Sequence, residues 1–295
     1  MLLVSILICG ISIASVMGSA IDSICLLFTA TFKSFVIAVL SIKSAKISYF
    51  AAEMKNVNPS FNIQATGIDF ETAQLFTEVG PMGISLAILD RENCFMAVVA
   101  YNFAGGLNEN ELADKIVSVF ESEKLFQQRY HKTHIFWAFT DSILVPAELM
   151  NAERNSKMLD LVFGDAKDCI IRSDFLYKHN LHNVYRSPRN IVDVFSTHLP
   201  VATQTHLFST IVNRDMPEGN HLYAGFYSNS VTIMLCREGK LQVVQNFAYN
   251  NPADSVFHLL NVCKAFDVTP DTVKLHINGM IDEQSGLYDA IYKYF

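Results

Sequence analysis

Two histidine pairs have the spacing that most suggests chemistry in this sequence. His131-x-x-His134 and His179-x-x-His182 each place two imidazoles three positions apart, which could suit a metal ion. Neither pair has a clear third ligand nearby. His131 and His134 also straddle the start of an expected strand, where residues three apart point to opposite faces. We therefore expect structural roles for both pairs and predict no metal site.

Other catalytic signatures are missing from the sequence. There is no G-x-S-x-G turn, Walker loop or G-x-G-x-x-G loop, and no spacing brings a serine, a histidine and an aspartate together. No two cysteines form a C-x-x-C pair, so we expect buried or half-buried free thiols in a reducing cytosol. The cysteines are Cys9, Cys25, Cys94, Cys169, Cys236 and Cys263. No catalytic residue is predicted.

The composition indicates a folded protein with a substantial core. The chain has 295 residues, of which 51% are hydrophobic, and this excludes disorder. The formal net charge is -7, and no block of Lys or Arg stands out. A nucleic-acid partner is therefore not expected.

The first fifty or so residues differ from the rest, and three interpretations of residues 1–53 compete. They could be a secretory signal, although the positive segment that usually opens such a signal is missing. They could be a membrane anchor through residues 1–42, since the apolar run up to Ile21 is long enough to span a bilayer. The third interpretation, which we favour, is that they lie outside the folded domain and that Met54 is the natural start.

The rest of the chain contains an internal duplication. Tyr101-Asn102-Phe103-Ala104 recurs as Gln245-Asn246-Phe247-Ala248. In each copy, β-branched and aromatic runs separated by polar turns predict three consecutive strands, followed by a helix and a fourth strand. In the first copy the strands are expected at 73–79, 84–89, 94–103 and 133–139, and in the second at 221–227, 231–236, 241–248 and 272–277.

The two expected helices start with matching signals. Asn108 is a good N-cap with Glu111 three residues later, which is a capping-box arrangement. Asn251 is the matching cap, followed by Pro252 at the first helical position, where its missing N–H costs nothing. A last helix is expected near residues 283–294.

A β-β-β-α-β unit is typical of the ribonuclease-H-like fold, and two such units in tandem are the architecture of actin-like ATPases. We therefore predict an α/β protein with duplicated ribonuclease-H-like units and an interdomain cleft. The expected division is an apolar upstream segment at 1–53, a first unit with connecting helices at 54–196 and a second unit at 197–295. Between the units, residues 168–172 could be a fifth strand of the first unit, 201–205 could also be extended, and Ser187 is expected to cap a helix.

The sequence resembles the bacterial domain-of-unknown-function family 3822 from about Ala73 to the C-terminus. The resemblance rests on the order and spacing of three dispersed segments. These are Ile143-Leu144-Val145-Pro146 followed by a helix, Val244-Gln245-Asn246-Phe247-Ala248-Tyr249 before a helix that Asp254 opens, and Leu275-His276-Ile277-Asn278-Gly279 followed by Leu287-Tyr288. It implies an actin-like fold and carries over no functional residues.

An actin-like fold implies where a nucleotide site would lie. Such ATPases place a metal-holding acid and a phosphate-binding glycine in the first hairpin of each unit, and a glycine pair near the adenine. The corresponding weak candidates for a vestigial nucleotide site are Glu78, Gly80, Gly83, Ser228, Ser230, Asn278 and Gly279. Pro81 removes one backbone donor from the first hairpin, and the second hairpin has neither an acid nor a glycine.

These departures favour a degenerate, cytoplasmic pseudo-ATPase that is not an enzyme. We expect no cofactor, although ATP with Mg²⁺ is what an intact site would take. The expected function is binding or scaffolding with another protein as partner, because relatives by fold in pilus and secretion-system assembly hold partners in this way. The alternatives are a nucleotide-binding switch with weak or no hydrolysis, and a membrane-tethered assembly protein if residues 1–53 are retained.

Overall fold

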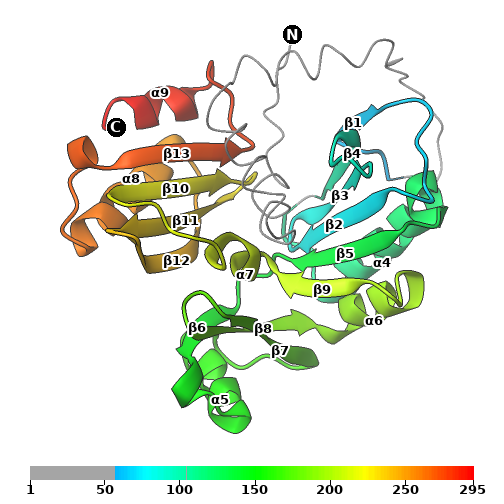
Figure 1. Cartoon of the computed structure of the whole chain (residues 1–295), viewed down its shortest axis with the longest axis horizontal. Coiled ribbons are helices and arrows are strands. Elements are labelled where there is room, and N and C mark those ends of the chain that lie inside the picture. Colours follow the sequence, from blue (N-terminus) through cyan, green and yellow to red (C-terminus); the bar gives the residue numbers. More distant parts are fainter. Residues whose placement is uncertain (1–56, 104) are drawn as a thin grey trace. The chain divides into compact units, whose positions relative to one another are not determined.

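The computed structural model of the chain describes residues 57–103 and 105–295 (Figure 1). The expectations for residues 1–53 therefore lie outside the described residues. The described chain divides into two compact units between Ser209 and Thr210. We call residues 57–209 the first unit and residues 210–295 the second unit. The boundary expected from sequence, between 196 and 197, falls inside helix α6 (Arg189–His198).

A six-stranded sheet in the order β1-β4-β3-β2-β5-β9 forms the centre of the first unit. Its strands are β1 (Phe61–Gln64), β2 (Gln74–Gly80), β3 (Gly83–Leu89), β4 (Phe95–Asn102), β5 (Lys132–Trp137) and β9 (Thr203–His206). The first four strands pair antiparallel, whereas β5 lies parallel to both β2 and β9. The sheet thus contains the predicted β-β-β-α-β unit and one additional strand at each edge.

Helices α4 (Glu109–Ser122) and α6 cover one face of this sheet. Ile116 of α4 and Phe195 of α6 are fully buried in one apolar cluster with Leu75, Val99 and Trp137 of the sheet. The apolar residues of α4 recur at spacings of three and four, so one face of the helix can pack on the strands. A short 3₁₀ helix η2 (Lys124–Gln127) leads from α4 into β5.

The second unit repeats the same pattern in the order β12-β11-β10-β13. Its elements are β10 (Asn220–Phe226), β11 (Ser230–Arg237), β12 (Lys240–Ala248), α8 (Pro252–Ala265), η4 (Pro270–Thr272), β13 (Lys274–Gly279) and α9 (Gly286–Tyr292). β10 pairs antiparallel with β11 and parallel with β13, as β2 does with β3 and β5. Its core contains Leu222, Ile233, Leu259 and Ile291.

The predicted helix caps are confirmed in both units. The Asn108 side chain accepts from the N–H of Glu111, and the Glu111 carboxylate accepts from the N–H of Asn108. Asn251 and Asp254 form the same reciprocal pair at the start of α8. Each pair satisfies two backbone donors that a helix start would otherwise leave open.

A β-bulge lies at the same place in both sheets. In the first unit, Met96 is the extra residue of β4 where the pairing with β3 shifts between Ile88 and Leu89. In the second unit, Gln242 is the extra residue of β12 where the pairing with β11 shifts between Leu235 and Cys236. Because both bulges have the same position relative to their hairpins, the registers of the two units can be aligned residue by residue.

This alignment corrects the sequence repeat. Asn246 lies opposite Thr232, and the matching pair in the first unit is Ala100 opposite Ser85. Asn102 lies instead opposite Gly83, at the end of its strand. Asn102 and Asn246 therefore lie on equivalent strands but two positions out of register. A two-residue shift keeps side chains on the same face, so similar sequence patterns fit both positions.

A separate three-stranded sheet in the order β6-β8-β7 lies within the first unit (Figure 1). Its strands are β6 (Ser142–Pro146), β7 (Cys169–Leu176) and β8 (Leu181–Pro188). η3 (Ala147–Leu149) and α5 (Ala152–Phe163) connect β6 to β7, and Leu159 of α5 packs with Val145 and Val184 of the sheet.

Two expectations for this region were wrong. The strand expected at 168–172 exists as β7, but it pairs with β8 and not with the first unit's main sheet. The strand that lies next to β5 at the edge of the six-stranded sheet is β9, and Trp137 of β5 donates to the Gln204 side chain of β9 at 3.2 Å. Ser187 does not cap α6, because it belongs to β8 and Pro188 is the residue before the helix.

The boundary between the units falls within helix α7 (Leu207–Val212). The C-terminal helix, expected near residues 283–294, is α9, and Ser285 caps it by accepting from the N–H of Tyr288. Within residues 57–103 and 105–295, no helix is both long enough and apolar enough to cross a membrane.

Candidate functional site

The first-unit candidates lie on the β2–β3 hairpin. Glu78 is a buried residue within β2, between Ser85 of β3 and Phe136 of β5. Gly80 and Gly83 pair with each other and flank the turn. Gly83 has φ +155°, and a side chain there would overlap the carbonyl of Tyr101. A Cβ at Gly80 would lie 3.1 Å from the Ala138 carbonyl oxygen.

Strand packing therefore accounts for both glycines of this hairpin. Gly83 allows β4 to approach closely, and Gly80 allows the chain after β5 to do so. The carbonyl of Met82, within the turn, accepts from the N–H of Phe103 at 2.8 Å. Pro81 lacks an N–H, so this turn offers fewer backbone donors than a phosphate cradle uses.

The second-unit candidates Ser228 and Ser230 lie at the β10–β11 hairpin, whose turn is held by hydrogen bonds from Tyr249. Ser228 lies in the turn between β10 and β11, and Ser230 is the first residue of β11. Tyr249 donates twice to this turn, from its N–H to the Asn229 carbonyl at 2.9 Å and from its hydroxyl to the Tyr227 carbonyl at 2.7 Å. The Asn246 amide lies 3.4 Å from the Ser230 hydroxyl oxygen. Both serines therefore lie in or next to a turn that is held by hydrogen bonds and contains no carboxylate.

Asn278 and Gly279 end β13 beside this hairpin. Gly279 has φ +94°, and a side chain there would overlap the backbone of Phe226. The next residue, Met280, donates to the Phe226 carbonyl at 2.7 Å. A Cβ on Gly225 would lie 3.0 Å from the Asn278 side-chain oxygen. The pairing of β13 with β10 therefore accounts for both Asn278 and Gly279.

Alignment of the two units places Glu78 and Gly225 at equivalent positions. Glu78 comes directly before Val79, which pairs with Ile84, and Gly225 comes directly before Phe226, which pairs with Val231. The first unit thus has a buried acid at this point, and the second unit has a glycine against which the Asn278 side chain lies. Of the seven candidates, three lie in the first unit and four in the second. Each group is clustered around its own hairpin.

The histidine pairs have no metal-ligand geometry. His134 stacks on Phe76 with ring centroids 4.8 Å apart, and its Nδ1 lies 2.5 Å from the Thr203 hydroxyl oxygen. Burial lowers the pKa of His134, and Lys132 adds to the effect. His182 lies against Phe175 at 5.0 Å. Among the described residues no group of three or more His, Cys, Asp or Glu could hold a metal ion.

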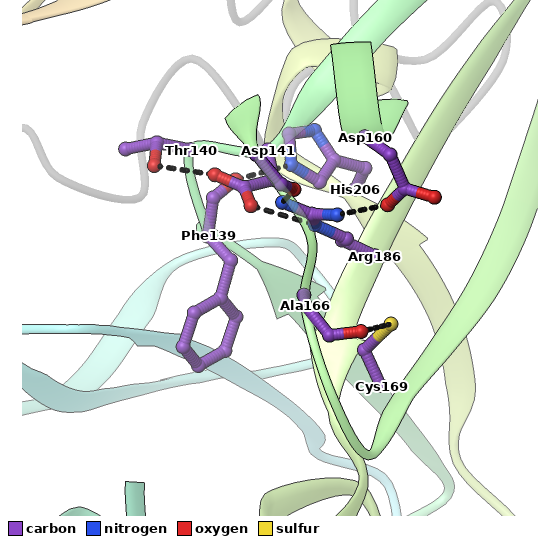
Figure 2. Close-up of polar contacts among 9 residues, drawn as sticks. Phe139, Thr140, Asp141, Asp160, Ala166, Cys169, Arg186 and His206 are labelled. Carbon is purple, nitrogen blue, oxygen red and sulfur yellow. Dashed lines mark hydrogen bonds and ion pairs between the residues drawn. The ribbon is translucent and has the colours of Figure 1, made fainter. Parts of the chain in front are cut away.

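Arg186 is a buried charged side chain of the first unit with three polar partners (Figure 2). It donates to Asp141 at 2.7 Å, to Asp160 at 2.9 Å and to the Gly164 carbonyl at 2.8 Å. Its side chain is 5% exposed, whereas those of Asp141 and Asp160 are 31% and 39% exposed. This cluster of one cation and two carboxylates joins the segment after β5, helix α5 and strand β8. Sequence reasoning missed it because its members lie far apart in the chain and leave no local signal.

A second polar network lies beside it in the first unit. The Asp174 carboxylate accepts from the Ser209 hydroxyl at 2.6 Å and from the His206 N–H at 2.8 Å. Ser209 in turn accepts from the Asn183 amide at 2.9 Å. Burial raises the pKa of Asp174, although these donors oppose the effect. Because Asn183 and Ser209 are buried and already bonded, this network braces β7, β8 and α7 and presents no free nucleophile.

Both ring nitrogens of His206 form hydrogen bonds. Its Nε2 bonds the Phe139 carbonyl at 2.8 Å, as Figure 2 shows, and its Nδ1 accepts from the Phe208 N–H at 3.1 Å. The side chain is completely buried, and burial lowers its pKa to about 4. This histidine is therefore a neutral structural group, since both ring nitrogens are bound to backbone and neither is available as a base.

The four described cysteines are free, as predicted. Cys236 and Cys263 are buried and Cys169 is half-buried. Cys94 is exposed, contrary to the expectation of burial, because it lies in the turn after Asp90, whose carboxylate accepts the Cys94 N–H at 2.9 Å. Cys9 and Cys25 lie outside the described residues.

The duplicated strand order and the paired hairpins define an α/β protein with the actin-like ATPase fold. Comparison with solved structures agrees. A Bacteroides thetaiotaomicron protein with actin-like ATPase fold and unknown function is similar, with a TM-score of 0.67 at 17% identity over 77% of this chain and 91% of that chain. The chain belongs to the family described as protein of unknown function (DUF3822), whose sequence profile matches residues 64–295.

Two further structures show weaker similarity. The PilM–PilN type IV pilus biogenesis complex has a TM-score of 0.47 at 12% identity, over 74% of this chain and 86% of that chain. The Aquifex aeolicus Ppx/GppA phosphatase has a TM-score of 0.33 at 11% identity, over 76% of this chain and 73% of that chain. No curated protein matches this sequence.

Proposed function

We propose that this chain is a cytoplasmic, non-catalytic protein that binds or scaffolds another protein through an actin-like fold without a working ATP site. One observation carries the proposal. The strand position that holds Glu78 in the first unit holds Gly225 in the second. An ATP–Mg²⁺ site in this fold uses an acid from each unit, so half of the metal-holding charge is missing.

The neighbouring contacts support the same conclusion. The Asn278 side chain lies beside Gly225, where an added side chain would meet it at 3.0 Å. A carboxylate therefore cannot be gained at this position without displacing Asn278. Phosphoryl transfer depends on positioned charge and a bridging metal, and loss of one preorganised electrostatic group typically costs about 100- to 1,000-fold in rate. Loss of an acid together with a donor at Pro81 should abolish useful turnover.

A steady-state ATPase assay with Mg²⁺ tests the non-catalytic part of the proposal. Wild type, Glu78→Ala and the matched control Glu121→Ala, an exposed acid of α4, should all stay at background. Turnover above background that Glu78→Ala abolishes and Glu121→Ala retains would refute the proposal and favour the nucleotide switch.

Purification of the full chain from its own cells tests the binding part. We expect a protein partner in a fixed ratio, and we expect Glu78→Ala to retain it at the same ratio because the acid is not used. A partner that is released by ATP in wild type, but not in Glu78→Ala, would contradict a nucleotide-independent scaffold.

A further inference from the structure

Strand β7 is an open edge of the three-stranded sheet. β8 occupies one side of it, and within the described residues no backbone hydrogen bond reaches its other side. Just before the strand, the Arg189 N–H donates to the Asp168 carbonyl opposite it. Since backbone groups alternate along an antiparallel strand, Ile171, Ser173 and Phe175 turn their N–H and C=O groups outward.

The side chains on this edge include exposed apolar groups. Ile171 is 39% exposed and Phe175 is 51% exposed, and they lie on the same face with the exposed Ser173 between them. The apolar cluster under α5 contains residues of β6 and β8 but none of β7. An unpaired edge strand with exposed apolar side chains is a template for pairing with another strand.

We propose that β7 pairs antiparallel with β7 of a second copy of this chain, about a two-fold axis at Ser173. The strand is complementary to itself in this register. Ile171 lies opposite Phe175 of the second copy, and Phe175 opposite its Ile171, which gives two aliphatic–aromatic cross-strand pairs. On the other face, Asp174 and Arg172 keep their contacts within their own chain, to Ser209 and to the Trp137 ring. The contact is isologous and closes as a dimer.

The apolar pairs favour this register over its neighbours. A slip of two residues in one direction would place Ile171 opposite Ser173 of the second copy and Phe175 opposite its Cys169. A slip in the other direction would place Phe175 opposite Ser173 of the second copy. Either slip loses both pairs of Ile171 with Phe175, and a slip of one residue would turn the apolar side chains to the wrong face. This self-complementarity favours a second copy over an unrelated strand as the occupant.

Light scattering coupled to size exclusion, on the full chain over a range of concentrations, measures the dimer. We expect Ile171→Lys and Phe175→Glu each to raise the dimer dissociation constant about tenfold or more, because each disrupts both symmetric pairs. The double variant should recover dimerisation, since the introduced lysine of one copy would then face the introduced glutamate of the other. Leu161→Lys, at an 86% exposed apolar residue of α5, is the matched control and should dimerise as wild type. A wild type that stays monomeric, or a double variant no better than the single ones, would overturn the proposal.

Disulfide trapping tests the register independently. With Cys94 and Cys169 replaced by serine, Ser173→Cys should cross-link to itself, because a hydrogen-bonded pair brings the two Cα atoms to about 5.5 Å. Ile171→Cys and Phe175→Cys should cross-link only when the two variants are mixed. Equal cross-linking of Ile171→Cys alone, or none for Ser173→Cys above the serine background, would also overturn the proposal. Neither experiment depends on the proposed function, which requires no dimer.

Discussion

Arg186 of β8 donates to Asp160 of α5 at 2.9 Å, and this ion pair fastens the helix to the three-stranded sheet. Asp141 accepts from the same guanidinium at 2.7 Å. We expect Arg186→Met to destabilise the protein by about 3–5 kcal/mol, because two carboxylates then lose a buried counter-charge. Urea unfolding monitored by circular dichroism measures the change.

Lys157→Ala is the matched control for that experiment. Lys157 contacts Glu153 at 2.7 Å on α5, but both side chains are more than 70% exposed. Solvent screens such a pair, so its loss should cost less than about 1 kcal/mol. Equal effects of the two substitutions would show that the burial of Arg186 contributes nothing.

Gly279→Ala should destabilise the second unit. The backbone of Gly279 has φ +94°, and an added Cβ would overlap the backbone of Phe226. We expect a loss of about 2 kcal/mol or more, measured as a lower Tm. Gly286→Ala is the control, because no atom lies within 4 Å of the added Cβ and the residue opens helix α9. A Gly279→Ala protein as stable as Gly286→Ala would contradict the close pairing of β10 with β13.

Acid sensitivity should depend on His206. Its pKa in the folded protein is lowered to about 4 by burial, whereas the unfolded chain binds a proton near pH 6.5. The stability it contributes is therefore complete above pH 6.5 and is lost as the pH falls towards 4, by roughly 3 kcal/mol in total. His206→Gln should be less stable at pH 7 and should lose less stability on acidification, as measured by Tm between pH 7.5 and 4.5.

The difference in pH dependence of Tm between wild type and His206→Gln gives the contribution of His206 alone. The raised pKa of Asp174 has the opposite sign, because its contribution is lost as the pH rises, and it is shared by both proteins. His131→Gln, at an exposed position, should keep the wild-type pH dependence. A His206→Gln profile parallel to wild type would refute the assignment.

The two capping boxes should contribute equally and independently. Asn108→Ala and Asn251→Ala each remove the acceptor for a helix-start N–H, at a cost of about 1 kcal/mol. Because the caps lie in different units and share no partner, the double variant should lose the sum of the two. Thermal unfolding of the three variants tests this, and a double variant markedly worse than the sum would indicate coupling.

Local signals made the repeated units predictable from sequence. Strand alternation, turn residues and caps all act within a few residues, as Asn108 and Glu111 do. The edge strand β1 was missed because it is only four residues long and is defined by its pairing with β4. The sheet to which β7 belongs was also mispredicted, since an extended segment does not reveal which strand it pairs with.

The candidate nucleotide residues were predicted only by position. Glu78, Gly80 and Gly83 lie on the β2–β3 hairpin. The packing reasons for Gly83 and Gly279 depend on strands that are distant in sequence. The polar clusters around Arg186 and Asp174 left no signal at all, because their partners are brought together by three different elements. Non-local polar contacts of this kind are visible only in the folded chain.

The paired bulges at Met96 and Gln242 also determine how the two halves of the chain are to be compared. An inserted residue interrupts a ladder and changes the bend of its strand, and related proteins retain such a bulge. A bulge at the same place in both halves is what duplication of one ancestral half would produce. An alignment of the two halves should therefore be anchored at these residues and not at Asn102 and Asn246, which lie two positions out of register.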